Sequence, residues 1–103
     1  MDEVFRALAD PSRRALLDRL YAENGQSLGQ LCAGMGMSRQ AVTKHIAILE
    51  AANLIASVKS GREKLHYLNP APIHEIGERW ISKYERARLT AMTALKQALE
   101  SEE

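Results

Sequence analysis

The chain has 103 residues, of which 46% are hydrophobic, and its 14 Lys or Arg and 13 Asp or Glu leave a formal net charge of +1. This composition indicates one ordinary folded domain, and it excludes disorder throughout and a membrane-spanning protein, because no apolar run approaches the roughly 20 residues that cross a bilayer. The single cysteine, Cys32, excludes an internal disulfide framework, and the charged N-terminus lacks a signal peptide, so we expect a cytoplasmic protein with no membrane partner.

The charge is distributed unevenly along the chain. Residues 38–69 carry a net charge of +3, whereas 1–37 and 70–103 each carry −1. A local basic surface on an otherwise balanced protein favours a phosphate backbone as its partner. A merely solvated face is an equally good interpretation of this charge alone.

Two helices are predicted at the start of the chain. Residues 2–9 form the first, which ends at Asp10 and Pro11. Asp10 can cap the next helix and Pro11 suits its first position, so we expect a second helix that runs to about residue 24. Its apolar residues recur at helical spacing and are expected to face the core. They are Leu16, Leu17, Leu20 and Tyr21.

A third, shorter helix is predicted to follow. Ser27 and Gln30 have the spacing of a capping box, which satisfies backbone N–H groups at a helix N-terminus. Leu28 and Leu31 are then expected to point inward. The GMGM run at 34–37 ends this helix, because a tight turn needs residues that tolerate positive φ, and glycine does.

The fourth predicted helix covers 38–53 and has two unlike parts. Ser38 can cap its N-terminus, and Asn53 can adopt the left-handed conformation that often ends a helix. The first turns carry side chains able to hydrogen-bond to DNA, whereas the remainder is largely apolar. The polar side chains are Ser38, Arg39, Gln40, Thr43 and Lys44.

A short helix, a glycine turn and a second helix with a polar front form the helix-turn-helix pattern, in which the start of the second helix enters the major groove. Arg39 can donate to guanine O6 and N7, and Gln40 can pair with adenine N6 and N7. Thr43 and Lys44 can reach a base edge or a phosphate. The alternative is an ordinary helix pair with solvated charges, which the basic bias and the adjacent hairpin make the poorer interpretation.

Residues 54–69 predict an antiparallel hairpin with a charged tip. Two strand-like runs flank the sequence SGRE. Two strands by themselves are marginally stable, so we expect the hairpin to pack against the helices. Arg62 at the tip, with Lys59 and Lys64 beside it, could enter a minor groove or bind its phosphates.

The last predicted helix covers 72–100. Its apolar residues recur at alternating steps of three and four, which is typical of a helix that packs against a partner helix. These apolar side chains would extend beyond the domain formed by 10–69, so we predict that they pack against a second copy of the chain in a homodimer. The helix at 1–9 is expected to contribute further apolar side chains to this interface. The predicted dimer interface comprises Val4, Phe5, Leu8, Ile81, Tyr84, Met92, Leu95 and Leu99.

Three segments occur in order over nearly the whole chain: ADPSRRALLDRL, MSRQAVTKHIAILEAANLI and VKSGREKLHYLN. Together they resemble the ArsR-type (ArsR/SmtB-like) winged helix-turn-helix transcriptional repressors. The resemblance implies a mainly α fold with a small β-hairpin wing, five helices and a long C-terminal dimerisation helix, in one domain spanning 1–103.

The same resemblance implies how such a protein binds DNA. A homodimer would bind an inverted-repeat operator through the recognition helix 38–53 of the helix-turn-helix at 27–53 and through wing residues 59–64. The helices at 1–9 and 72–100 would form the dimer interface.

The metal sites of this family are not matched. One uses a Cys-x-Cys pair in the third helix, where this chain has Cys32 alone. The other uses Asp-x-His followed by His-x-x-Glu in the last helix, where His74 lacks the Asp and the second histidine is missing. Because a tetrahedral site needs three or four ligands, we expect no metal and no cofactor, as in the branch of the family that lacks these ligands. The sequence identifies no inducer.

The remaining reactive side chains have structural interpretations. His45 is expected to pack against the protein with a hydrogen bond to the backbone, and His66 to lie at an exposed strand position. Cys32 is interpreted as a core residue, with an oxidant sensor as the alternative. Trp80 and Tyr84 are expected to pack against a partner helix, with the lining of an effector pocket as the alternative.

Two functions therefore remain open. The first is a dimeric DNA-binding repressor, and the second is a winged-helix module that binds proteins and not DNA. The groove-reading side chains at the front of 38–53 favour DNA. An enzyme is not expected, because the sequence has no Ser-His-Asp order, paired carboxylates, phosphate-binding loop or metal cluster.

Overall fold

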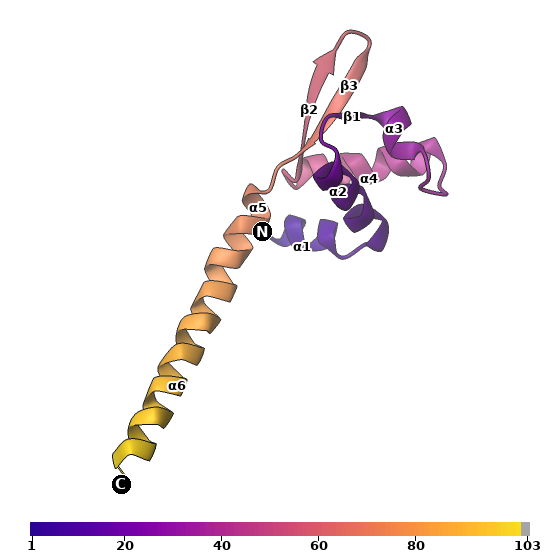
Figure 1. Ribbon diagram of the computed structural model, residues 1–103. Coiled ribbons are helices and arrows are strands. Elements are labelled where there is room, and N and C mark those ends of the chain that lie inside the picture. Colours follow the sequence, from indigo (N-terminus) through magenta and orange to yellow (C-terminus); the bar gives the residue numbers. More distant parts are fainter. Residues whose placement is uncertain (102–103) are drawn as a thin grey trace. The chain divides into compact units, whose positions relative to one another are not determined.

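The computed structural model describes residues 1–101, which fall into two units, one ending at Pro72 and one beginning at Ile73 (Figure 1). The first unit contains four helices and a three-stranded antiparallel sheet, so the predicted mainly α fold with a hairpin wing is confirmed. Its elements are α1 (Asp2–Leu8), α2 (Pro11–Ala22), β1 (Gln26–Ser27), α3 (Leu28–Cys32), α4 (Arg39–Ala51), β2 (Ile55–Ser60) and β3 (Glu63–Leu68).

Side-chain caps begin α2 and α3 where the sequence predicts them. One carboxylate oxygen of Asp10 accepts hydrogen bonds from the backbone N–H groups of Ser12 and Arg13, at 2.8 and 3.2 Å. Ser27 and Gln30 form a complete capping box, in which each side chain accepts from the other residue's backbone N–H. These caps satisfy donors that have no partner within the helix, and so they fix where each helix begins.

A single core joins the helices to the base of the sheet. The leucines at the centre of α2, α3 and α4 are fully buried together with the residue that enters β2. The core therefore holds α4 by its apolar back. The largest fully buried side chains are Leu16, Leu20, Leu31, Val42, Leu49 and Leu54.

Tyr21 does not face this core, contrary to the prediction from helical spacing. Its side chain is 84% exposed, whereas Leu20 is fully buried. Leu17, four residues earlier on the same face of α2, is buried, so the core covers this face but not as far as Tyr21. Tyr21 lies in the last turn, one residue before α2 ends at Ala22.

The predicted hairpin is present, and Figure 1 shows it projecting from the helices of the first unit. The strands β2 and β3 pair from Ile55 opposite Leu68 to Ser60 opposite Glu63, which leaves a two-residue turn at the tip. Gly61 in this turn has a φ of +61°, which glycine adopts without steric cost.

A third strand, β1, was not predicted from the sequence. It pairs with β3 through Gln26 opposite His66 and Ser27 opposite Leu65, so that β3 is the central strand. This pairing also corrects the predicted exposure of His66, whose side chain is only 4% exposed. The imidazole Nδ1 donates to the backbone oxygen of Gln26 at 2.9 Å. Because β1 covers this edge of the hairpin, a polar residue that looks exposed in a two-stranded ribbon becomes buried.

His45 and Cys32 are both half-buried, which differs in part from the environments predicted for them. His45 is half-buried, as expected of a packed residue, but its partner is not backbone. Its Nδ1 lies 3.3 Å from a guanidinium nitrogen of Arg13, and it must accept this hydrogen bond because arginine can only donate. Cys32 is a half-buried free thiol at the end of α3, which is less buried than a core residue would be.

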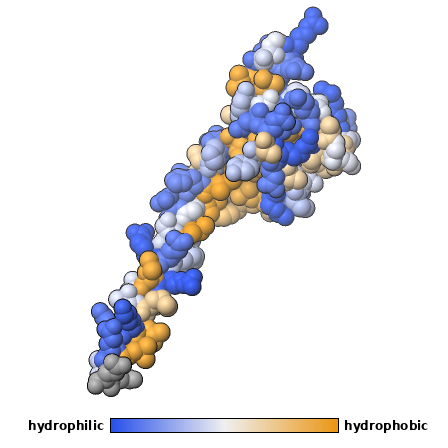
Figure 2. Space-filling view, in the orientation of Figure 1, coloured by the Kyte–Doolittle hydropathy of each residue, from blue (hydrophilic) through white to orange (hydrophobic). Residues whose placement is uncertain are grey.

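The predicted helix at 72–100 is helical throughout. It comprises α5 (Ala71–Ile76), one π-helical turn η1 (Gly77–Ile81) and α6 (Ser82–Ser101). A π turn contains an extra residue, so it shifts the apolar side chains that follow relative to a regular helix. Within the described residues, α6 has no buried side chain, and Figure 2 shows hydrophobic residues exposed along it. No described helix combines the length and apolar character needed to cross a membrane.

Candidate nucleic-acid interface

The helix α4 buries one face and exposes the other. Val42, Ile46 and Leu49 recur at steps of four and three and are buried. Ser38 precedes the helix in an extended conformation, and its hydroxyl oxygen accepts from the backbone N–H of Ala41 at 3.1 Å. This cap fixes the first turn of α4, which is the part predicted to contact bases.

Polar side chains at the front of α4 line one shallow hollow on the surface of the first unit. The hydroxyl of Thr43 donates to the backbone oxygen of Arg39 at 2.8 Å, so its outward-facing groups are the methyl and the oxygen lone pairs. The predicted base-reading residues of the helix are all exposed and line this hollow together, and Ser38 precedes them as the N-cap. The residues that line the hollow are Arg39, Gln40, Thr43 and Lys44.

Arg19 of α2 fixes the turn that precedes this front, and sequence analysis did not identify it. Its guanidinium donates to the backbone oxygens of Gln30 and Leu31, at 2.8 and 2.7 Å, and to that of Ala33. These carbonyls lie at the C-terminal end of α3, where they have no partner within the helix. A signal for this role in the sequence is weak, because an arginine on a helix surface is most often solvated.

The wing carries its cations at exposed positions. Lys59 and Lys64 lie directly opposite each other on β2 and β3, and Arg62 occupies the tip. Like charges directly opposite each other destabilise a sheet, and an anion between them relieves the repulsion. The hydroxyl of Ser57 in β2 donates to the carboxylate of Glu50 in α4 at 2.7 Å, which ties the wing to the recognition helix.

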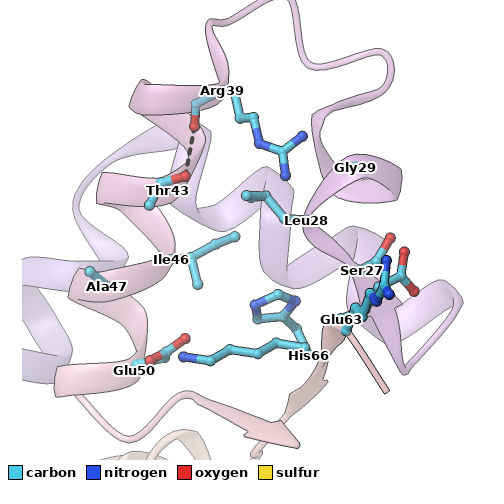
Figure 3. A pocket seen from close by; sticks show the side chains of 12 residues that line it. Ser27, Leu28, Gly29, Arg39, Thr43, Ile46, Ala47, Glu50, Glu63 and His66 are labelled. Atoms are coloured by element: carbon cyan, nitrogen blue, oxygen red, sulfur yellow. Dashed lines mark hydrogen bonds between the residues drawn. The ribbon is translucent and has the colours of Figure 1, made fainter. Parts of the chain in front are cut away.

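The recognition helix and the wing meet along one groove (Figure 3). Arg39 and Thr43 reach it from α4, while Arg62 and Lys64 reach it from the wing. The structure thus brings predicted contact residues from two segments of the sequence to the same surface. Lys59 lies on the neighbouring strand and does not line the groove.

The residues predicted for the dimer interface lie in both units. Val4 is buried within its own unit, so it is not available to a partner, whereas Phe5 is 45% exposed and Leu8 is half-buried. The predicted residues of η1 and α6 are all exposed. These are Ile81, Tyr84, Met92, Leu95 and Leu99.

Metal-ligating side chains do not gather anywhere in the part of the chain that the structure describes. No group of three or more His, Cys, Asp or Glu lies close enough there to hold an ion. The residues that line the groove and the hollow supply hydrogen-bond donors, acceptors and cations, which suit a nucleic acid.

Comparisons with known proteins agree with this geometry. A family model described as a helix-turn-helix domain matches residues 8–58, which contain α2, α3, α4 and the start of the wing. The HTH-type transcriptional regulator YuzN of Bacillus subtilis is 33% identical over 86 residues, covering 78% of this chain and 94% of that protein. The HTH-type transcriptional regulator Rv2034 of Mycobacterium tuberculosis is 30% identical over 101 residues, covering 98% of this chain and 90% of that protein.

A solved structure extends the similarity over almost the whole chain. The ArsR-like transcriptional regulator from Rhodococcus sp. RHA1 has 33% sequence identity and a TM-score of 0.75, covering 97% of this chain and 90% of that one. Its similarity, like that of the relatives above, is to transcriptional regulators and not to enzymes. The chain belongs to the ArsR/SmtB-type family of DNA-binding helix-turn-helix transcriptional regulators.

Proposed function

We propose that the protein is a homodimeric repressor that binds an inverted-repeat operator through α4 and the wing. The observation that carries this proposal is the shared groove, in which Arg39 of α4 and Arg62 and Lys64 of the wing line one surface. The apolar back of α4 is buried in the core, so its polar front is held rigidly for readout.

The groups at this surface divide into two kinds of contact. Arg39 and Gln40, at the start of α4, are proposed to read base edges in the major groove. Thr43 presents an acceptor and a methyl group, and Lys44 presents a cation, so these two contact a base or a phosphate. The wing cations Arg62 and Lys64, with Lys59 nearby, are proposed to bind phosphates or enter the adjacent minor groove.

The dimer is proposed from the apolar side chains that α6 exposes. Met92, Leu95 and Leu99 are between 57% and 59% exposed, and they recur at helical spacing. Contiguous apolar surface of this kind marks an interface in soluble proteins. A two-fold dimer would present two copies of α4, and each chain would then act as one winged-helix domain on one half-site.

Selection of bound DNA from a random pool tests the proposed function. The expected result is enrichment of an inverted repeat whose half-site centres are about 10 bp apart, or a multiple of this spacing. Enrichment of a single unrepeated site, or of no sequence at all, would contradict the proposal.

Sedimentation equilibrium tests the dimer separately. The wild-type protein is expected to be a dimer at tens of micromolar, and the double variant Met92→Glu/Leu95→Glu is expected to be a monomer that has lost specific DNA binding. A matched control, Lys96→Glu, changes the charge of the same helix at a polar position. A monomeric wild-type protein that binds the selected site with full affinity would refute the dimer.

A further inference from the structure

The groove between α4 and the wing is large enough to hold a small molecule. It has a volume of about 390 Å³, within the range of roughly 300–1,000 Å³ that small-molecule sites occupy. Leu28 of α3 and Ile46 and Ala47 of α4 give it an apolar wall (Figure 3). Apolar side chains make no hydrogen bonds or ion pairs with a sugar-phosphate backbone, but they can pack against the apolar part of a small organic molecule.

A largely buried histidine supplies the groove with an accessible hydrogen-bond acceptor. His66 lines the groove and is only 4% exposed. Its Nδ1 donates to the backbone oxygen of Gln26, so the neutral ring carries its lone pair on Nε2. Within the described residues Nε2 makes no hydrogen bond, and since no buried side-chain nitrogen or oxygen there lacks a partner, Nε2 is accessible from the groove. In the neutral ring this atom is an acceptor open to the groove, so a hydroxyl group of a bound molecule can donate to it.

The rim of the groove favours an anion. Three cationic side chains, Arg39, Arg62 and Lys64, line it, against the carboxylates of Glu50 and Glu63. Glu50 already accepts the hydrogen bond of Ser57, so part of its charge is satisfied. The remaining excess of donors suits a carboxylate.

We propose that this groove binds a small organic acid with a flat apolar body and a hydroxyl group. The body lies against Leu28 and Ile46, the hydroxyl donates to Nε2 of His66, and the carboxylate contacts the cations of the rim. Binding is incompatible with DNA, because the ligand occupies the groove that Arg39, Arg62 and Lys64 line. This last consequence depends on the proposed function, whereas the ligand site does not.

A titration of the full-length protein with 6-hydroxy-2-naphthoate tests the site. The nitrogen and ring-proton NMR signals of His66 are expected to move with a Kd of about 1 mM or tighter, which is attainable for a ligand of this size. His45 and His74 do not line the groove, so their signals are internal controls. Two further probes separate the contacts: 2-naphthoate lacks the hydroxyl and 2-naphthol lacks the carboxylate, and each is expected to bind at least about threefold more weakly.

A matched pair of variants locates the binding. Ala47 and Ala51 are both exposed on α4, but only Ala47 lines the groove. Ala47→Phe fills the groove and is expected to abolish the movement of the His66 signals, whereas Ala51→Phe leaves it unchanged. The proposal is overturned if the wild-type His66 signals stay fixed, or if they move equally in Ala47→Phe.

Competition with DNA is measured by fluorescence anisotropy on the selected site. At a ligand concentration of about ten times its Kd, the apparent Kd for DNA is expected to rise about tenfold. An unchanged DNA affinity while the His66 signals still move refutes mutual exclusion. A protein that binds no DNA in the absence of ligand refutes the proposed function alone, since the titration of the free protein still decides whether the groove is a ligand site.

Discussion

The guanidinium of Arg19 in α2 donates a hydrogen bond of 2.7 Å to the backbone oxygen of Leu31, in the last turn of α3. The same guanidinium also donates to the backbone oxygens of Gln30 and Ala33. One side chain thus holds the end of α3 and the start of the glycine turn that leads to α4. The contact therefore ties α3 and the start of this turn to α2.

Replacement of Arg19 by alanine is expected to lower the free energy of unfolding by about 1–3 kcal/mol, because it leaves helix-terminal carbonyls without their charged donor. Arg19→Lys should recover only part of this loss, because an ammonium group lacks the planar fork that reaches several oxygens. Urea denaturation followed by circular dichroism measures both effects. The exposed Arg39→Ala is the control and should stay within about 0.5 kcal/mol of wild type. An Arg19→Ala protein as stable as wild type would show that the contact is not structural.

Asn53 ends the turn after α4 with a φ of +62°, the only positive φ at a non-glycine residue that the structure describes. Asparagine tolerates this conformation better than most residues, and glycine tolerates it best. We expect Asn53→Ala to lower the free energy of unfolding by about 1 kcal/mol, and Asn53→Gly to be neutral or stabilising. Thermal denaturation distinguishes the two, and equal stability of the alanine and glycine variants would contradict this explanation.

The carboxylate of Asp10 gives stability a specific pH dependence. Partial burial raises the pKa of Asp10, but backbone hydrogen bonds from Arg13 and Ser12 and the positive charge of Arg13 outweigh this effect, so the pKa lies below its ordinary value of 3.8. The ionised form therefore stabilises the folded state above pH 3.8, and this contribution is lost as the pH falls through the lowered pKa.

Asp10→Asn keeps the capping oxygen and removes the charge, so it isolates this effect. The wild-type protein should be the more stable of the two at neutral pH, and the difference should shrink as the pH falls below 3.8. Melting temperatures across this range provide the measurement. A difference that persists unchanged at the lowest pH would mean that the charge of Asp10 does not contribute.

Most of the fold could be predicted because it depends on local chemistry. The caps at Asp10, Ser27 and Ser38 involve residues at most three positions apart, so their spacing in the sequence carries the whole signal. The hairpin and the glycine turn are local in the same way. The front of α4 was predictable for a related reason, because its polar side chains stand next to one another in the sequence.

The features that sequence analysis missed depend on contacts between distant residues. The strand β1 has only two residues, and His66 is buried because its partner Gln26 lies forty positions away. Arg19 contacts carbonyls beyond the end of its own helix. Tyr21 is exposed although Leu17, one turn earlier on the same side of α2, is buried, so the core covers that side only up to the last turn. Helical spacing describes which residues share a face, but it does not determine which part of that face is covered.

Two kinds of arginine should affect DNA binding differently. Arg62→Ala, at the wing tip, should weaken binding to all sequences alike and reduce the slope of log K against log salt by about 1, as loss of one phosphate contact does. Arg39→Ala should cost about 1–3 kcal/mol at the base pair that it reads and relax preference there. Anisotropy titrations at several salt concentrations, on the selected site and its single-base variants, separate the two. If either variant binds like wild type, the contact assigned to that arginine is wrong. Arg88→Ala, in α6, is the control for the loss of one positive charge.

In the proposed complex the front of α4 lies in the major groove of each half-site. An iron–EDTA group attached to Gln40→Cys, in a Cys32→Ser background, cleaves DNA next to this position and so locates it. On the selected operator we expect two clusters of cleavage, each within a half-site and centred about 10 bp apart or at a multiple of this distance. Cleavage spread evenly along the DNA, or confined to sequence outside the half-sites, would contradict this placement of α4.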